Sequence, residues 1–269
     1  MIDFRMIDRK KYPELGGYNN AQLYDYFIGC GGLFLVVEMT RKMNLKPGDI
    51  VLDLGCGFGS ASLYLAKTFG VTVIGVDFWF PPEKMNDRIH HEGLSNKVIP
   101  LNIDITQNIP FAENYFDAIF CMNSFFIYGE NSDFIKKITG SLKAGGTFCI
   151  GGECFNQEPT YKRKEDIPEA YNFEWNWDAW DTCFSKYHSP EWWRSKIEET
   201  GLLNIKYCKE LDYGVIFFED IALNYYHYFN EHVLSIGAMI PQGRIVNTIL
   251  QGRVAFPYPT LYVLSAIKK

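Results

Sequence analysis

A glycine-rich loop between a strand and a helix constrains this chain more than any other feature. Residues 51–60 read VLDLGCGFGS, an apolar strand followed by glycines at every second position. Glycines at such a turn let the backbone approach a ligand closely, with its amides and the N-terminus of the next helix facing the ligand. Ser60 stands where a dinucleotide-binding fingerprint has its third glycine, which disfavours a nicotinamide dinucleotide. The pattern predicts a loop that binds another small ligand, although simple glycine turns are common.

Around this loop, short apolar segments alternate with segments of helical spacing. Strands are expected at 50–54, 71–76, 98–103, 116–122 and 146–151, and helices at 60–69, 82–92 and 133–142. Strands that are apolar almost throughout and alternate with helices indicate a parallel sheet covered on both faces. The expected class is therefore α/β, with a Rossmann-like, seven-stranded, mostly parallel sheet.

The rest of the chain divides by composition. We expect an N-terminal helical segment (1–47), a ligand-binding core (48–152), an aromatic-rich cap (153–200) and a section that completes the sheet around an inserted helix (201–269). Helices are expected at 20–28, 33–39, 189–201 and 219–232, and strands at 202–208 and 261–267. Ser189, Pro190 and Glu191 are typical of a helix start.

Three acidic residues follow three successive predicted strands. Asp53 lies just before the glycine loop, and Asp77 and Asp104 end the next two strands. A carboxylate at the tip of the second strand can accept hydrogen bonds from both ribose hydroxyls of a nucleotide. A single strand-end aspartate is more often a helix cap, but three behind one loop favour a nucleotide-like ligand.

On these residues the sequence resembles the class I S-adenosylmethionine-dependent methyltransferases. The resemblance lies in VLDLGCGFG (51–59), VTVIGVD (71–77), Asp104, NIPFAENYFDAIFCMNSFF (108–126) and LKAGGTFCIGGE (142–153), and more loosely in HSPEWWRSKIEETG (188–201). One departure is Ala144, where the family usually has proline. The resemblance implies S-adenosyl-L-methionine as the cofactor.

Carried over by position, the resemblance implies a role for each matching residue. The backbone of Gly55, Cys56 and Gly57 lies against the methionine part of the cofactor, which Asn123 faces. Asp53 orders the loop or contacts the amino group of the cofactor, directly or through water.

The adenosine side follows from the next two strands. Asp77 binds the ribose, Phe78 packs on the adenine, and Asp104 and the Ile105 backbone contact its edge. Three N-terminal residues are expected to close over the cofactor: Tyr18, Gly31 and Gly32.

Methyl transfer from a sulfonium depends mainly on alignment, and a general base is needed only where the acceptor must lose a proton. His188, just before the predicted 189–201 helix, is a candidate base, and its alternative is a structural histidine. Tyr128 is a candidate for orienting the acceptor. No metal-ligand spacing is present, so no metal is expected.

The aromatic residues between 171 and 193, interleaved with acids, favour a small cationic acceptor such as an amine, or else form a lid or a homo-oligomer contact. With 26 basic and 32 acidic residues the net charge is −6, which disfavours nucleic-acid binding. No apolar stretch is long enough to span a membrane, and seven cysteines without a CxxC pair favour a cytoplasmic protein. The alternatives are an RNA or protein methyltransferase and a non-catalytic adenosyl-ligand-binding protein.

Overall fold

The fold is built on a single sheet of seven strands. The computed structural model describes residues 8–18, 23, 31–160, 186–215 and 257–269. The strands are β1 (Ile50–Leu54), β2 (Thr72–Asp77), β3 (Val98–Asn102), β4 (Phe116–Met122), β5 (Leu142–Phe155), β6 (Leu203–Glu210) and β7 (Pro259–Lys268). Their order across the sheet is β3-β2-β1-β4-β5-β7-β6. The first five strands pair in parallel, and β7 runs antiparallel to both β5 and β6. The expected α/β class and the mostly parallel sheet are confirmed.

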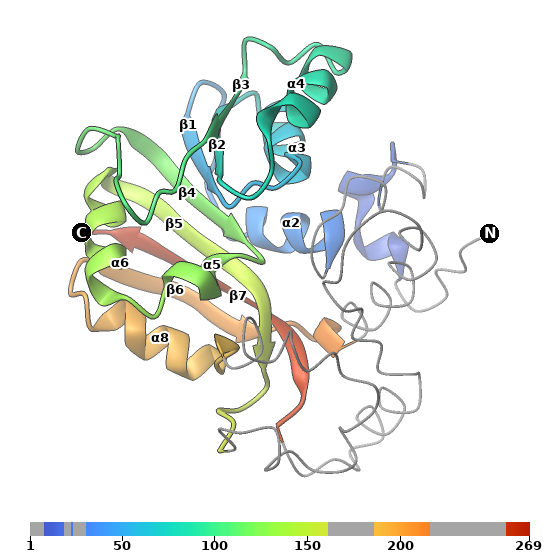
Figure 1. Cartoon of the computed structure of the whole chain (residues 1–269). Coiled ribbons are helices and arrows are strands. Elements are labelled where there is room, and N and C mark those ends of the chain that lie inside the picture. The colour runs from blue at the N-terminus through green and yellow to red at the C-terminus, as the bar shows by residue number, and fades with distance from the viewer. Residues whose placement is uncertain (1–7, 19–22, 24–30, 161–185, 216–256) are drawn as a thin grey trace.

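Helices cover both faces of this sheet (Figure 1). Short 3-10 turns at η1 (Arg9–Lys11) and η2 (Pro13–Leu15) precede α2 (Gly32–Thr40), α3 (Ser60–Phe69) and α4 (Pro82–His91), and the later helices are α5 (Phe125–Tyr128), α6 (Ser132–Gly140) and α8 (Pro190–Glu198). Side chains of α2, α3 and α4 share one buried cluster, and those of α5, α6 and α8 share another. Neighbouring residues of β1, Val51 and Leu52, enter opposite clusters, as the alternation of a strand requires.

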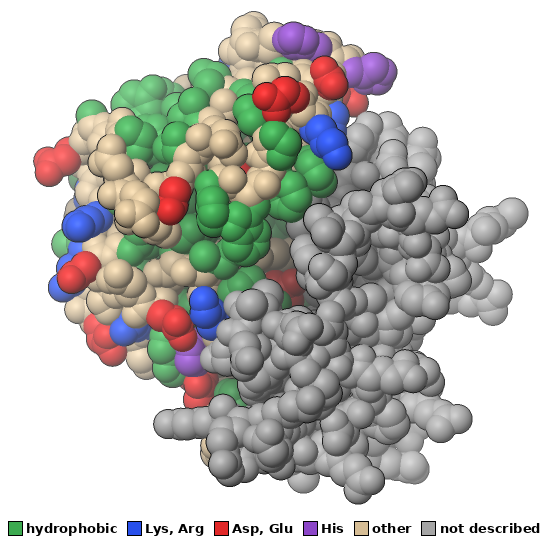
Figure 2. All heavy atoms as spheres, viewed as in Figure 1, with side chains coloured by type: hydrophobic (Ala, Val, Ile, Leu, Met, Phe, Trp, Pro, Cys, Tyr) green, Lys and Arg blue, Asp and Glu red, His purple; other side chains and the backbone are tan. Residues whose placement is uncertain are grey.

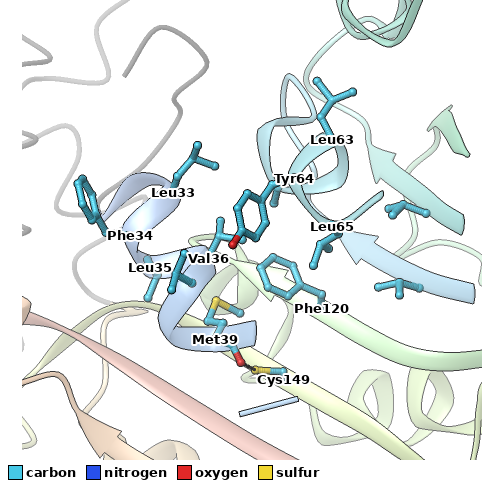
Figure 3. Packing of buried hydrophobic residues seen from close by; sticks show 14 of the residues in the cluster. Leu33, Phe34, Leu35, Val36, Met39, Leu63, Tyr64, Leu65, Phe120 and Cys149 are labelled. Atoms are coloured by element: carbon cyan, nitrogen blue, oxygen red, sulfur yellow. Dashed lines mark hydrogen bonds between the residues drawn. The ribbon is translucent and has the colours of Figure 1, made fainter. Parts of the chain in front are cut away.

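The core between α2, α3 and the sheet is tightly filled. Figure 3 shows Met39 of α2 and Leu65 of α3 beside Phe120 of β4 and Cys149 of β5. All four are fully buried, and the Cys149 thiol donates a 3.7 Å hydrogen bond to the Met39 carbonyl oxygen. This packing fixes α2 against β4 and β5.

Two expected boundaries differ from the structure. β5 is 14 residues long and reaches Phe155, because its pairing with β7 continues to the Phe155–Pro259 pair. Residues 153–155, assigned to the cap, are therefore sheet, and α8 buries Trp193 in the core. At its other end, β5 begins at Leu142, which pairs with Phe116 ahead of a register shift between β4 and β5. The sequence predicts the end of a helix at this residue.

The other segments expected at the sequence level lie partly outside the described residues. These include the helices at 20–28 and 219–232 and the aromatic part of the cap at 161–185. The four-part domain division stays a prediction for this reason. Within the described ranges, no helix combines the length and the apolar character needed to cross a membrane.

Removing the Phe120 side chain should destabilise the fold strongly. Phe120→Ala leaves a cavity beneath α2 and is expected to cost about 3–5 kcal/mol of unfolding free energy. Leu202→Ala serves as the control, because Leu202 is 36% exposed and its loss leaves no cavity. Chemical denaturation of both variants measures the difference, and equal costs would show that the packing around Phe120 is not tight.

Candidate active site at the carboxyl ends of the central strands

The candidate site lies where the strand order reverses. β1 pairs with β2 on one side and with β4 on the other, so chain connections leave β1 and β4 in opposite directions. In open α/β sheets, such a reversal opens a crevice at the carboxyl ends of the strands, and ligands bind there. The residues singled out in the sequence follow β1, β2, β3 and β4 and therefore meet at this edge.

The glycine loop folds back onto the end of β2. The amides of Gly55 and Cys56 both donate to the carbonyl oxygen of Val76, at 2.8 and 3.1 Å. Gly55 has a φ of +74°, and a Cβ at this position would overlap the Ser124 hydroxyl. Both the left-handed conformation and the close approach thus require glycine here. Gly57 also has a positive φ, and its amide points at the next strand-end acid.

The Cys56 side chain points away from the crevice. Its sulfur lies 3.9 Å from the Met85 sulfur of α4, and a Cβ on Gly75 would sit 3.0 Å from it. Burial raises the pKa of the Cys56 thiol well above its usual value. A thiol held in the protonated form is a poor nucleophile, so the role expected of Cys56 stays that of its backbone.

Asp77 organises the rim of the crevice. Its Oδ2 accepts a 2.9 Å hydrogen bond from the Gly57 amide, and its Oδ1 accepts from the amides of Trp79 and Phe80 at 2.8 and 3.2 Å. A carboxylate has roughly four acceptor positions, so one of them on Oδ2 is left for a ligand hydroxyl. Reaching both hydroxyls of a ribose, as expected from the sequence, would require sharing an acceptor or displacing one amide.

Two aromatic rings stand exposed beside Asp77. Phe78 is 42% and Trp79 57% exposed, with ring centroids 5.4 Å apart. Figure 2 shows hydrophobic side chains gathered near the middle of this view of the described surface. Exposed rings next to a strand-end carboxylate suit a flat apolar ligand that also carries hydroxyl groups.

Asp104 and Ile105 follow β3 on the same edge. Oδ1 of Asp104 accepts from the Thr106 hydroxyl at 2.6 Å and from the Thr106 amide at 3.0 Å. The Thr106 hydrogen bond holds the pKa of Asp104 below its usual value, so the side chain is ionised at neutral pH. The Ile105 side chain is buried in the core, which leaves its backbone for any contact with a ligand.

The end of β4 closes the other side of the crevice. Asn123 has a φ of +55°, and its amide donates to the Gly151 carbonyl oxygen at 2.8 Å. The Ser124 hydroxyl donates to the carbonyl oxygen of Leu54, the last residue of β1, at 2.9 Å. Ser124 thus joins the ends of the two central strands. The sequence analysis missed this residue, although a serine just after a buried strand is typical of a helix start.

Tyr128 of α5 lies beside the glycine loop. Its ring is stacked on Phe134 with centroids 5.3 Å apart, and its hydroxyl lies 3.5 Å from the position that a Cβ on Gly55 would occupy. Burial raises the pKa of the Tyr128 phenol far above its usual value. The hydroxyl therefore keeps its proton and acts as a hydrogen-bond donor, which fits an orienting role and not that of a base.

The N-terminal residues lie on the α2–α3 face. Gly31 has a φ of +90°, and a Cβ there would lie 2.6 Å from the Leu35 Cβ and 2.9 Å from Leu261 of β7. Gly31 and Gly32 therefore permit the start of α2 against the sheet. The Tyr18 ring packs near Tyr64 of α3, with centroids 6.2 Å apart. Closure of these residues over a cofactor stays a prediction.

His188 has carboxylates on both ring nitrogens. Nδ1 lies 2.7 Å from Glu158 and Nε2 lies 3.1 Å from Glu130. A general base needs an unprotonated nitrogen that faces its substrate. The arrangement favours the structural alternative that the sequence left open for this residue.

Comparison with known proteins agrees with this geometry. A family model described as a methyltransferase domain matches residues 52–150. This part of the chain is therefore similar to methyltransferase domains. The match begins in β1 and ends in β5, so it contains the glycine loop and all four strand ends of the crevice.

Individual relatives of the domain act on amines. Over 152 residues the chain is 30% identical to phosphoethanolamine N-methyltransferase 1 of Arabidopsis thaliana, covering 56% of this chain and 30% of that protein. It is 25% identical over 173 residues to the glycine/sarcosine/dimethylglycine N-methyltransferase of Actinopolyspora halophila, covering 64% of this chain and 28% of that protein. The chain thus matches less than a third of the length of these curated relatives.

A solved structure extends the likeness to the whole fold. Phosphoethanolamine N-methyltransferase 2 of Haemonchus contortus, in complex with S-adenosyl-L-methionine, gives a TM-score of 0.65 at 20% identity. The alignment covers all of this chain and 60% of that one. The likeness confirms the Rossmann-like α/β fold of the chain.

Asp53 lies in β1, just before the glycine loop, and is 1% exposed. It accepts a 2.6 Å hydrogen bond from the Ser62 hydroxyl. Burial, with a smaller contribution from the charge of Asp77, raises the pKa of Asp53 to about 7, although the Ser62 bond opposes the shift. Burial and the Ser62 bond favour the loop-ordering role for Asp53, and contact with a cofactor stays a prediction.

The pH dependence of stability should report this raised pKa. Between the ordinary pKa of 3.8 and the folded value of about 7, the native state binds more protons than the unfolded state. Stability therefore falls as pH rises through that window, by up to roughly 1.4 kcal/mol per pH unit. Asp53→Asn removes the titrating group, so the stability of wild type relative to this variant should fall with pH and level off above the folded pKa. Denaturant unfolding across the window measures it, and a constant difference would contradict a raised pKa.

Proposed function

We propose that this protein is an S-adenosylmethionine-dependent methyltransferase that methylates a nitrogen of a small-molecule amine. The observation that carries the proposal is the glycine loop at the reversal of strand order, with Asp77 and Asp104 on the same edge, inside a segment that matches a methyltransferase domain. Fold alone does not define an activity, so the proposal rests on the residues of the crevice.

The residues present fit S-adenosylmethionine. The exposed Phe78 and Trp79 rings offer a surface for an adenine, and Asp77 retains an acceptor for a ribose hydroxyl. Asp104 and the Ile105 backbone lie next along this edge, whereas the Gly55–Gly57 backbone and Asn123 border the part nearest β4. Bound there, S-adenosylmethionine supplies a methyl group on a sulfonium, which is already a good leaving group.

The chain itself contributes alignment of the acceptor. Holding the acceptor nitrogen in line with the methyl carbon can supply most of the rate enhancement. Tyr128 keeps a protonated hydroxyl at the glycine loop, where it can donate to a bound group. An amine that arrives uncharged needs no base before attack, which agrees with a site in which His188 is already paired with two carboxylates.

A small amine is the acceptor that the observations favour. The curated relatives described above are N-methyltransferases of phosphoethanolamine and of glycine derivatives. The net charge of −6 disfavours RNA as the acceptor. Methylation of RNA or protein, and non-catalytic binding of an adenosyl ligand, are the alternatives.

The same proposal includes a cytoplasmic location and no metal requirement. The cysteines in the described ranges, Cys56, Cys121, Cys149, Cys154 and Cys208, are free thiols. Among the described residues, no group of three His, Cys, Asp or Glu side chains is arranged to hold a metal ion. Activity unchanged by a chelator would support metal independence, and loss that a divalent ion restores would overturn it.

Replacing Asp77 should weaken cofactor binding. Asp77→Asn loses a charge-assisted acceptor, and we expect S-adenosylhomocysteine to bind roughly tenfold or more weakly, since tenfold corresponds to about 1.4 kcal/mol. Asp87→Asn on the exposed side of α4 is the matched control and should bind as wild type. Isothermal titration calorimetry measures both. Equal affinity in two folded variants would remove Asp77 from the ligand site.

Turnover separates the proposal from its alternatives. With S-adenosylmethionine present, small primary to tertiary amines should be methylated in preference to phenols and thiols, as detected by mass spectrometry of the products. Binding of the cofactor without product from any small acceptor would favour a non-catalytic role. Methylation of an RNA or a protein in the same assay would favour the macromolecular alternative.

A further inference from the structure

An unusual cluster surrounds His188 at the edge of the molecule nearest α8. The imidazole is 15% exposed and lies between two carboxylates that come from different parts of the chain. Glu130 follows α5 and approaches Nε2 at 3.1 Å, and Glu158 follows β5 and approaches Nδ1 at 2.7 Å. The second carboxylate oxygen of Glu158 accepts a 2.9 Å hydrogen bond from the Ser189 amide at the start of α8.

Aromatic rings of α8 complete the surroundings of this imidazole. Trp192 is stacked on it with centroids 3.6 Å apart and planes 7° apart, and Trp193 meets it edge-on at 5.6 Å. Lys196, one turn further along α8, lies 5.7 Å from the Trp192 ring centroid. Among the described residues, the charged groups that contact the His188 ring are the two glutamates. A stacked cation between two anions is a favourable arrangement.

Only the protonated ring satisfies both glutamates. A neutral imidazole has one donor nitrogen and one acceptor nitrogen, whereas the imidazolium donates from both. A neutral His188 would therefore place a lone pair against a carboxylate oxygen. The imidazolium avoids this repulsion and also places one positive charge between two negative ones.

The titration directions agree with this geometry. Burial alone would lower the pKa of His188, but the hydrogen bonds and charges of Glu158 and Glu130 raise it above 6.5. Burial likewise would raise the pKa of Glu158, but the His188 and Ser189 hydrogen bonds hold it below 4.5. Both shifts favour the charged forms that make the contact. This contact is lost as pH rises through the raised His188 value, and also as pH falls through the lowered Glu158 value.

Packing contacts connect the His188 cluster to the glycine loop through α5. Trp193 of α8 packs on Gly129, where a Cβ would lie 2.6 Å from its ring, and its centroid is 5.5 Å from that of Phe125. Gly129 and Glu130 directly follow Tyr128, whose hydroxyl lies beside Gly55. The His188–Glu130 contact therefore holds the end of α5 near the start of α8. Trp193 holds the same end of α5 from the buried side.

We propose that the imidazolium of His188 is a positioning residue that fixes α5, and with it Tyr128 and Ser124, against the glycine loop. It acts through Glu130 and has no contact with the reacting atoms. Its counterpart Glu158 ties the same imidazolium to the end of β5 and the start of α8. The effect of this positioning on cofactor binding rests on the proposed function, but the positioning of α5 itself does not.

The first experiment follows His188 directly. Nuclear magnetic resonance of the ring protons, from mildly acidic to mildly alkaline pH, should show His188 still protonated at neutral pH, with the exposed His90 and His91 as comparators in the same spectrum. The backbone amides of Tyr128 and Gly55 should shift with the same midpoint. Glu130→Gln and Glu158→Gln should each lower that midpoint.

Two results of this titration would overturn the proposal. One is a His188 ring that is neutral at neutral pH in the wild-type protein. The other is that the Ser189 amide signal shifts with the His188 titration but the Tyr128 and Gly55 amide signals do not. The cluster would then anchor α8 without affecting the glycine loop. Both readings come from the wild-type protein, so they hold even where a variant fails to fold.

The second experiment measures the consequence for the site. Calorimetry with S-adenosylhomocysteine should show affinity several-fold lower at mildly alkaline than at neutral pH in wild type, and low at both pH values in Glu130→Gln. Glu198→Gln, an exposed charge removal on α8, should behave as wild type. Affinity in Glu130→Gln equal to wild type at both pH values would overturn the effect on the site. Absence of any binding in wild type would instead contradict the proposed function, and the titration of His188 would still decide the positioning of α5.

Discussion

The pairing of β1 with β4 is the constraint on which the site depends. These strands carry the two sides of the crevice, and their ends are joined by the hydrogen bond from the Ser124 hydroxyl to the Leu54 carbonyl oxygen. Because Gly55 lacks a Cβ, the loop can press against Ser124 at this point. The glycine loop takes its position from this junction, and the loop in turn brings the Gly57 amide to Asp77 and the Gly55 backbone to the Tyr128 hydroxyl.

Around the junction, the protein uses buried polar groups to order the backbone. Asp53 works from inside the core through Ser62, and Asp77 works at the surface through three amides. The first carboxyl is shifted toward its neutral form by burial, whereas the second stays accessible to a ligand. Two aspartates that look alike in the sequence thus perform separate tasks because their solvent exposure differs.

The sequence predicted those parts of the fold that depend on local pattern. The apolar strands, the glycine loop and the strand-end acids all follow from periodicity and turn chemistry, and they lie where expected. It did not predict the extension of β5 to Phe155, because that depends on pairing with β7 more than a hundred residues later. For the same reason it missed the contacts of His188, whose partners Glu130 and Glu158 lie on segments distant in sequence.

The position of β7 has a consequence for the order in which the chain assembles. In the described sheet β6 pairs with β7 alone, and β7 also completes the far side of β5. During synthesis, β6 emerges from the ribosome long before the residues at 259–268 that give it a partner. The parallel half of the sheet can form early, whereas the other half must wait for contacts of long sequence separation, which form slowly. In the interval β5 has an open edge, and an unpaired strand edge makes a folding intermediate prone to aggregation.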